Sequence, residues 1–206
     1  MQIDHAVYGV QDLEAAASRM KADFGLGSVQ GGHHPGWGTG NRIVPLGPNY
    51  IELLAAVDEA EAESNEFGQS LLAAVADGDR LLGWCVSTED VDAVAARLEL
   101  PVTAGSRVRP DGTVLRWRSA GLDRALAEPS LPFFITWDVP QDLHPGRAEA
   151  DHVSSPHGIT WLEIGGDALR LNEWLAGSEL PVRVVGGPPG VLAVGIAAEP
   201  EEIVLR

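Results

Sequence analysis

The stretch IDHAVYGVQDLEAA, residues 3–16, decides the fold class of this chain. Its first half alternates between two sides, with Ile3, His5 and Val7 on one of them, and this period of two predicts a β-strand. Asp12 can cap the N-terminus of a helix, because its carboxylate accepts hydrogen bonds from free backbone N–H groups. The helix that follows carries an apolar stripe at Leu13, Ala16, Ala17 and Met20. The stretch therefore predicts a strand that leads directly into a helix.

The residues that follow complete a first unit, which we interpret as β-α-β-β-β and assign to residues 1–57. A Gly-rich loop, GGHHPGWGTGN (31–41), comes after the helix. Two predicted strands, RIVPLG (42–47) and YIELLAAV (50–57), come next. An acidic helical connector, residues 58–79, separates this unit from the rest of the chain.

The same order then returns. Leu82–Val86 predicts a strand and Glu89–Leu98 a helix, and the two helices align when Asp12 is placed on Asp90, a shift of 78 positions. Three more predicted strands, SRVRP (106–110), TVLRWRS (113–119) and PFFITWD (132–138), complete a second βαβββ unit at residues 80–138. Residues 139–157 are a linker, and residues 158–206 repeat the order more faintly as a third unit. Such repetition predicts an α+β protein of repeated units, because one unit cannot bury its apolar faces alone.

Composition and charge exclude several classes of protein. No run of about 18 apolar residues is present, so we predict no membrane span. The N-terminus lacks the features of a signal peptide, and Cys85 is the only cysteine, so we expect a cytoplasmic protein without disulfides or a Cys-based zinc site. The net charge of −16, with Lys21 as the only lysine, would repel nucleic acid. The acidity suits a cationic ligand, and the alternative is a solvated surface that keeps the protein soluble.

Three segments give the chain a resemblance to the vicinal oxygen chelate superfamily, in its glyoxalase-like branch. They are the opening IDHAVYGVQDLEAA, the loop HPGWGTGN (34–41) and the strand YIELLAAV (50–57). The resemblance implies that βαβββ units form an open, cup-shaped mixed sheet, as in glyoxalases and bleomycin-resistance proteins. It also implies a divalent metal (Mn, Fe, Ni or Zn), held by a His on the first strand and a Glu on the last strand of each unit.

Carried over by position, the resemblance makes His5 and Glu52 the metal ligands of the first unit. Glu52 also interrupts an apolar run, where an ionised carboxylate needs a partner, a metal or a cavity. The alternative is a solvated Glu on an edge strand. In the second unit the shift of 78 places Gly83 at the position of His5, and the strand PFFITWD puts Thr136, Trp137 or Asp138 near that of Glu52. Half of the ligand set is missing, so a protein without metal is the alternative.

The Gly-rich loop resembles the family's loop over the cup, which makes it a candidate for ligand contacts. Its glycines permit a close approach of the backbone to a ligand. Thr39 and Asn41 could donate hydrogen bonds, and Trp37 could stack on the ligand or cap the core. The alternative for His34 is an exposed loop histidine. The predicted ligand-binding residues are His34, Trp37, Gly38, Thr39 and Asn41.

Two functions follow from the resemblance. The first is a metal-dependent lyase, isomerase or dioxygenase that acts on a small molecule with vicinal oxygens, in which Glu52 holds the metal or acts as a general base. The second is a metal-free ligand-binding or antibiotic-sequestering protein. A scaffold with a vestigial pocket is a third possibility. An odd number of units leaves one half-cup without a partner, which points to a possible homodimer.

Overall fold

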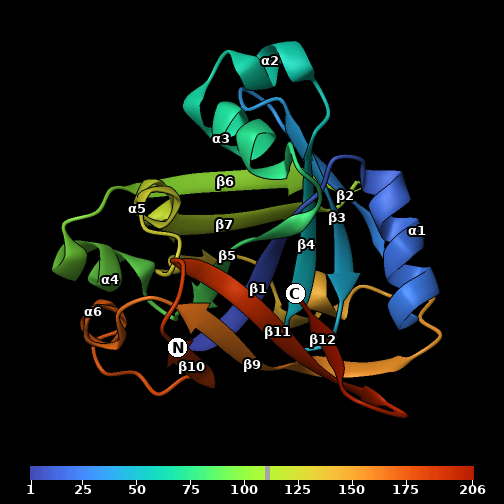
Figure 1. Ribbon diagram of the computed structural model, residues 1–206. Helices are drawn as coiled ribbons and strands as arrows, with labels where there is room; N and C mark the ends of the chain where they lie inside the picture. The colour runs from blue at the N-terminus through green and yellow to red at the C-terminus, as the bar shows by residue number, and fades with distance from the viewer. Residues whose placement is uncertain (110–111) are drawn as a thin grey trace.

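Two β-sheets carry the architecture of the computed structural model, which describes residues 1–109 and 112–206 (Figure 1). The larger sheet has eight strands in the order β2-β3-β4-β1-β5-β8-β7-β6. Their bounds are β1 Gln2–Gly9, β2 Val29–His34, β3 Thr39–Pro45, β4 Tyr50–Ala56, β5 Arg80–Ser87, β6 Val102–Val108, β7 Val114–Ala120 and β8 Phe133–Trp137.

The larger sheet consists of two halves with the same connectivity. In the first half β4 runs parallel to β1, with Glu52 opposite Val7. In the second half β8 runs parallel to β5, with Phe133 opposite Cys85. An antiparallel β1–β5 pair joins the halves. The helices α1 (Leu13–Phe24) and α4 (Val91–Leu98) both begin after an Asp that caps them, as the aligned sequences predict.

The larger sheet must be strongly curved, since its two edge strands, β2 and β6, come into contact with each other. It forms the nearly closed cup of a glyoxalase-like α+β fold, so the predicted fold class is confirmed. The short helices α2 (Glu59–Glu63) and α3 (Glu66–Val75) lie together at one end of the molecule (Figure 1). Leu71 and Val75 of α3 pack against Val7 and Leu54 of the cup. The connector therefore covers part of the concave face.

The C-terminal residues form a second sheet of four strands in the order β10-β9-β11-β12. It packs on the other side of the larger sheet, where Trp84 and Val86 share one apolar core with Leu162 and Val194. The elements are β9 Ser155–Gly165, α6 Ala168–Trp174, β10 Val182–Val185, β11 Gly190–Glu199 and β12 Ile203–Leu205. Here the first strand runs parallel to β10 rather than to the last strand, which differs from the other two units. The division of the chain into units stays a prediction.

The structure departs from the sequence prediction at the Gly-rich segment, which is a β2–β3 hairpin rather than a loop. Glycine is required inside this hairpin, because a Cβ atom on Gly31 would lie 1.8 Å from Oδ1 of Asn41. In the second half, α5 (Leu122–Ala127) was not predicted. The predicted end of the strand SRVRP at Pro110 lies outside the described residues. None of the described helices has both the length and the apolarity that crossing a membrane requires.

Asn49 connects the two sheets, because its buried Oδ1 accepts a hydrogen bond of 2.7 Å from the backbone N–H of Ile159 on β9. We expect Asn49→Ala to lower the free energy of unfolding by about 1–3 kcal/mol, since this N–H is then buried without a partner. Urea denaturation measures the change. Asn172→Ala, at an exposed position of α6, is the matched control. Equal changes in both variants would contradict a structural link through Asn49.

Candidate functional site in the cup

A cavity of about 410 Å³ lies in the cup. Its walls come from both halves of the larger sheet, from α3 and α5, and from the turn before β11. Most of the lining is apolar, and polar side chains are few. His5 and Glu52 both line this cavity, so the structure brings together the two residues that the resemblance singled out.

An irregularity in β1 explains how Asp4 and His5 come to interact. Strict alternation would place them on opposite faces of the sheet. The β1–β5 pairing shifts register between the pairs Ile3–Val86 and His5–Cys85, which leaves Asp4 as an extra residue. A bulge of this kind re-aims side chains. The Asp4 carboxylate thereby reaches Nδ1 of His5 at 2.7 Å.

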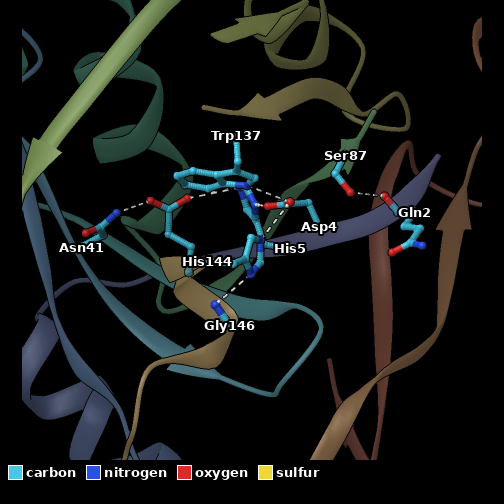
Figure 2. Close-up of polar contacts among 9 residues, drawn as sticks. Gln2, Asp4, His5, Asn41, Ser87, Trp137, His144 and Gly146 are labelled. Carbon is cyan, nitrogen blue, oxygen red and sulfur yellow. Dashed lines mark hydrogen bonds and ion pairs between the residues drawn. The ribbon is translucent and has the colours of Figure 1, made fainter. Parts of the chain in front are cut away.

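Asp4 is the centre of a buried hydrogen-bond network (Figure 2). Its second oxygen, Oδ2, accepts from Nε1 of Trp137 at 3.0 Å and from Nε2 of His144 at 3.2 Å. The side chain is 2% exposed. Burial opposes ionisation, but the hydrogen bonds from His144 and His5 outweigh it and lower the pKa of Asp4 far below its ordinary value of 3.8. Asp4 is therefore a permanent carboxylate.

This carboxylate determines which ring nitrogen of His5 and of His144 carries the hydrogen that faces it. His144 donates from Nε2, because its Nδ1 accepts a hydrogen bond from the backbone N–H of Gly146 at 3.1 Å. His5 donates from Nδ1 to Asp4 and stacks on Tyr50, with ring centroids 4.5 Å apart. Its other nitrogen, Nε2, therefore faces the cavity and lies 3.6 Å from Oε2 of Glu52.

Glu52 lies at the end of this line of groups. Its side chain is 14% exposed, and its Oε1 accepts a short hydrogen bond from Nδ2 of Asn41. The Oδ1 atom of Asn41 in turn accepts from the backbone N–H of Gly32 at 2.8 Å, which fixes the orientation of the amide. One carboxylate oxygen is thus held by a neutral donor and the other faces His5. Glu52 can exchange a proton with His5 after a small movement of either side chain.

The structure places the five predicted ligand-binding residues in two groups. His34, Trp37 and Asn41 line the cavity, and Trp37 packs against Phe67 of α3. Thr39 lies behind His34 and bonds its Nδ1 through Oγ1 at 3.0 Å. Gly38 packs against α2, where a Cβ atom would lie 2.3 Å from the backbone N of Ala62. The ligand-binding roles of all five stay predictions.

His34 is held neutral by its surroundings. Burial lowers the pKa of His34 below 6.5, Glu52 opposes this shift, and the charge of Arg107 reinforces it. A neutral imidazole can accept or donate one hydrogen bond at Nε2, which lies 3.4 Å from Nδ2 of Asn41.

The metal ligands that the resemblance implies are only half present. The shift of 78 positions takes β1 onto β5, so Gly83 occupies the position of His5 and Cys85 that of Val7. Because Val7 pairs with Glu52 and Cys85 pairs with Phe133, the equivalent of Glu52 is Phe133. The sequence prediction of Thr136, Trp137 or Asp138 for this position was wrong, because it assumed a later register for β8.

The remaining donors do not fit a four-ligand metal site. The 3.6 Å between Nε2 of His5 and Oε2 of Glu52 suits two ligands of one ion. Gly83 offers no donor, however, and Phe133 offers an aromatic ring. Arg107 adds a positive charge that acts on Glu52 from within the same cavity.

Asp4, His5 and Cys85 form a second group that could hold a metal, since each has one ligand atom within 4.8 Å of the others. Two observations argue against such an ion. Ligand atoms of one tetrahedral ion lie roughly 3.3 Å apart or more, whereas Asp4 and His5 are hydrogen-bonded at 2.7 Å. Burial also raises the pKa of Cys85 well above its ordinary value, which disfavours the thiolate that binds metals.

Sequence reasoning missed three residues of the site. Asp4 could have been found, because it is a charged residue inside an apolar strand. A buried charge needs a hydrogen-bond or ion-pair partner, so such a position indicates a paired carboxylate. Arg107 is the one charged residue of β6, and alternation alone could not tell whether its side chain faces the cup or the solvent. His144 lies in the linker and reaches Asp4 only through the tertiary fold.

Comparisons with known proteins agree with this fold. The chain matches the family described as a glyoxalase-like domain over residues 3–178. A comparison with proteins of curated function gives no significant match. A hypothetical protein from Staphylococcus aureus has a similar structure, with a TM-score of 0.64 and 16% identity over 98% of this chain and 84% of its own.

Two methylmalonyl-CoA epimerases match with lower TM-scores. The protein from Mycobacterium tuberculosis has a TM-score of 0.47 and 19% identity over 68% of this chain and 89% of its own. The protein from Streptomyces coelicolor, in complex with 2-nitronate-propionyl-CoA, has a TM-score of 0.45 and 20% identity over 66% and 96%. We take no substrate from them.

Replacing Asp4 tests the buried network. We expect Asp4→Asn to lower the free energy of unfolding at pH 7 by about 3 kcal/mol or more, because three N–H donors lose a charged acceptor. The contribution of the lowered pKa is complete above the ordinary value of 3.8 and is lost as the pH falls below it. The difference from the wild type should therefore narrow below about pH 4.

Guanidinium denaturation across this pH range measures the effect. Asp151→Asn is the matched control, since it removes the same charge from an exposed pair with Lys21 and should cost less than about 1 kcal/mol. A loss for Asp4→Asn as small as that of the control would contradict the network.

Proposed function

Because the chain belongs to the glyoxalase-like domain family, we propose that it binds a small molecule with vicinal oxygens in the cup and moves a proton on it without a metal. The reaction class is that of an isomerase or lyase. The observation that carries the proposal is the position of Glu52, a carboxylate on a mainly apolar cavity wall beside Nε2 of His5.

Glu52 is suited to act as the base. A carboxylate that removes a proton from carbon works best where few waters solvate it and where its position is fixed. Glu52 is 14% exposed and is oriented by Asn41. It would take a proton from the carbon next to a carbonyl; the electron pair of the C–H bond would form a C=C bond, and the π pair of the carbonyl would move onto its oxygen as an enolate. Return of the proton to the other face of the same carbon inverts its configuration. Return to the neighbouring carbon also requires the proton of the vicinal hydroxyl to move to the enolate oxygen, and then the carbonyl changes place.

His5 and Asp4 support this role from behind. The ionised Asp4 holds the Nδ1 proton of His5, so Nε2 can accept the proton that Glu52 has taken or supply one in return. The arrangement of Asp4, His5 and Glu52 is a line of three groups that ends at the cavity.

A metal-free binding protein is the second candidate. The mainly apolar lining of the cavity and the absence of donors at Gly83 and Phe133 favour it. Such a protein would sequester a ligand, and the antibiotic-sequestering relatives named by the resemblance are of this kind. The two candidates differ in one respect, which is whether Glu52 changes the ligand.

Proton exchange into solvent distinguishes them. We expect the wild type, treated with a metal chelator, to accelerate deuterium incorporation into 2-hydroxyacetophenone or phenylpyruvate in D₂O, followed by NMR. Glu52→Gln should lower that rate by about 10²–10⁴-fold, the usual contribution of a general base. Glu63→Gln, at an exposed position of α2 outside the cavity lining, is the matched control. No acceleration of either compound by the wild type would overturn the proposal in favour of ligand binding.

Adding the two ligands that the second half lacks, at positions 83 and 133, tests whether their absence prevents tight metal binding. A Cβ atom on Gly83 meets no atom within 4 Å, so a side chain fits there. We expect Gly83→His combined with Phe133→Glu to bind Zn²⁺ more tightly than the wild type by over about 100-fold, beyond the usual effect of a supporting contact. Isothermal titration calorimetry measures both affinities. Equally tight stoichiometric binding by the wild type would contradict the metal-independent account.

A further inference from the structure

We infer that Arg107 is an anion-binding residue of the cup and that the ligand is a small monocarboxylate with an apolar, aromatic body. The inference deepens the proposed function and rests on it for the assignment of the cup as the ligand site.

Arg107 has no partner for its charge. It lies on β6 and lines the cavity, and its Cδ would be 3.4 Å from a Cβ atom on Gly32 of β2, the other edge strand, which contacts β6. In the described part of the chain no hydrogen bond or ion pair involves this side chain. Its Nη1 is the one buried side-chain polar atom without a hydrogen-bond partner among the described residues.

Arg109, which directly follows β6, is a nearby arginine whose guanidinium does have a hydrogen-bond partner. Its Nη2 donates to the carbonyl oxygen of Leu143 at 2.9 Å. An unpaired, buried N–H of a charged group has lost its hydration without gaining a hydrogen bond, so native proteins rarely keep one without a reason. A guanidinium stays charged and presents five donors in a plane that matches the two oxygens of a carboxylate.

Glu52 does not already serve as that carboxylate. Its charge acts on Arg107, but no nitrogen of Arg107 lies within ion-pair distance of it. Its oxygens are occupied by Asn41 and face His5. The cup therefore contains one anchored base, Glu52, and one partly buried cation, Arg107, whose guanidinium is free to bind the carboxylate of a ligand.

The rest of the cavity defines the ligand further. Its aromatic walls, Phe67, Trp117, Phe133 and Trp137, suit a flat apolar body. A dianionic phosphate would meet one partly buried cation, Arg107, and the exposed Arg80 at the edge of the lining, together with the repulsion of Glu52. A monocarboxylate matches the charge of Arg107, so we commit to that class.

A matched pair of probes tests the inference. 4-Phenylbutyrate and 4-phenylbutan-1-ol share one carbon skeleton, and Trp117 and Trp137 report their binding by fluorescence, with calorimetry for affinity. We expect the wild type to bind the acid at least about 10-fold more tightly than the alcohol. Arg107→Met should abolish this preference, and Arg107→Lys should keep part of it. Glu52→Gln should bind the acid more tightly than the wild type does, because a like charge is removed.

Arg109→Met is the control, since it removes the same charge from a position just after β6 that lies outside the cavity lining. If Arg107→Met does not fold, Arg107→Gln, which keeps polar donors without charge, replaces it. Equal affinity of the wild type for acid and alcohol, no binding of the acid at millimolar concentration, or an unchanged preference in Arg107→Met would each overturn the inference.

The test separates this inference from the proposed function. A preference for the acid that depends on Arg107, without any proton exchange, would leave the anion site standing and remove the isomerase or lyase. Proton exchange of the neutral 2-hydroxyacetophenone that depends on Glu52, without a preference for the acid, would support the isomerase or lyase and remove the anion site.

Discussion

The carboxylate of Asp4 is the constraint on which the rest of the site depends. A charge that is 2% exposed is tolerated only when its atoms are hydrogen-bonded, and both oxygens of Asp4 accept hydrogen bonds, from three parts of the chain. His5 belongs to the first half of the cup, Trp137 to the second half, and His144 to the linker that leads to the smaller sheet. Satisfying one buried group thus fixes the orientation of His5, and through it the surroundings of Glu52.

The two halves of the cup share a backbone plan and differ in chemistry. The same parallel pairing places Glu52 next to β1 and Phe133 next to β5. One half therefore presents an imidazole and a carboxylate, and the other presents an open space at Gly83 and an aromatic ring. The two halves repeat one backbone arrangement, but the cavity between them is asymmetric, because polar groups of the first half face mainly apolar walls of the second. Arg107, from the second half, supplies a partly buried positive charge to these walls, and Arg80 of β5 lines the cavity from an exposed position.

Much of the fold could be predicted from the sequence, because local signals repeat. The capping residues Asp12 and Asp90 and the strands before them gave the two halves and the shift between them. The site was harder to predict. His5 and Glu52 followed from strand positions, but Asp4 reached the same side through a bulge that alternation does not reveal. His144 and Arg107 depend on contacts across the fold, and no local pattern encodes which face of β6 turns toward β2.

The state of the His5 imidazole tests the central claim, that the polar groups of the cup form a proton-carrying line rather than a metal site. Nitrogen-15 NMR of the imidazoles, recorded before and after one equivalent of Zn²⁺, reports which nitrogen carries the proton. The account predicts an Nδ1 proton on His5 that depends on Asp4, and ¹⁵N shifts that Zn²⁺ leaves unchanged. A stoichiometric shift of His5 Nε2 on addition of Zn²⁺ would contradict it.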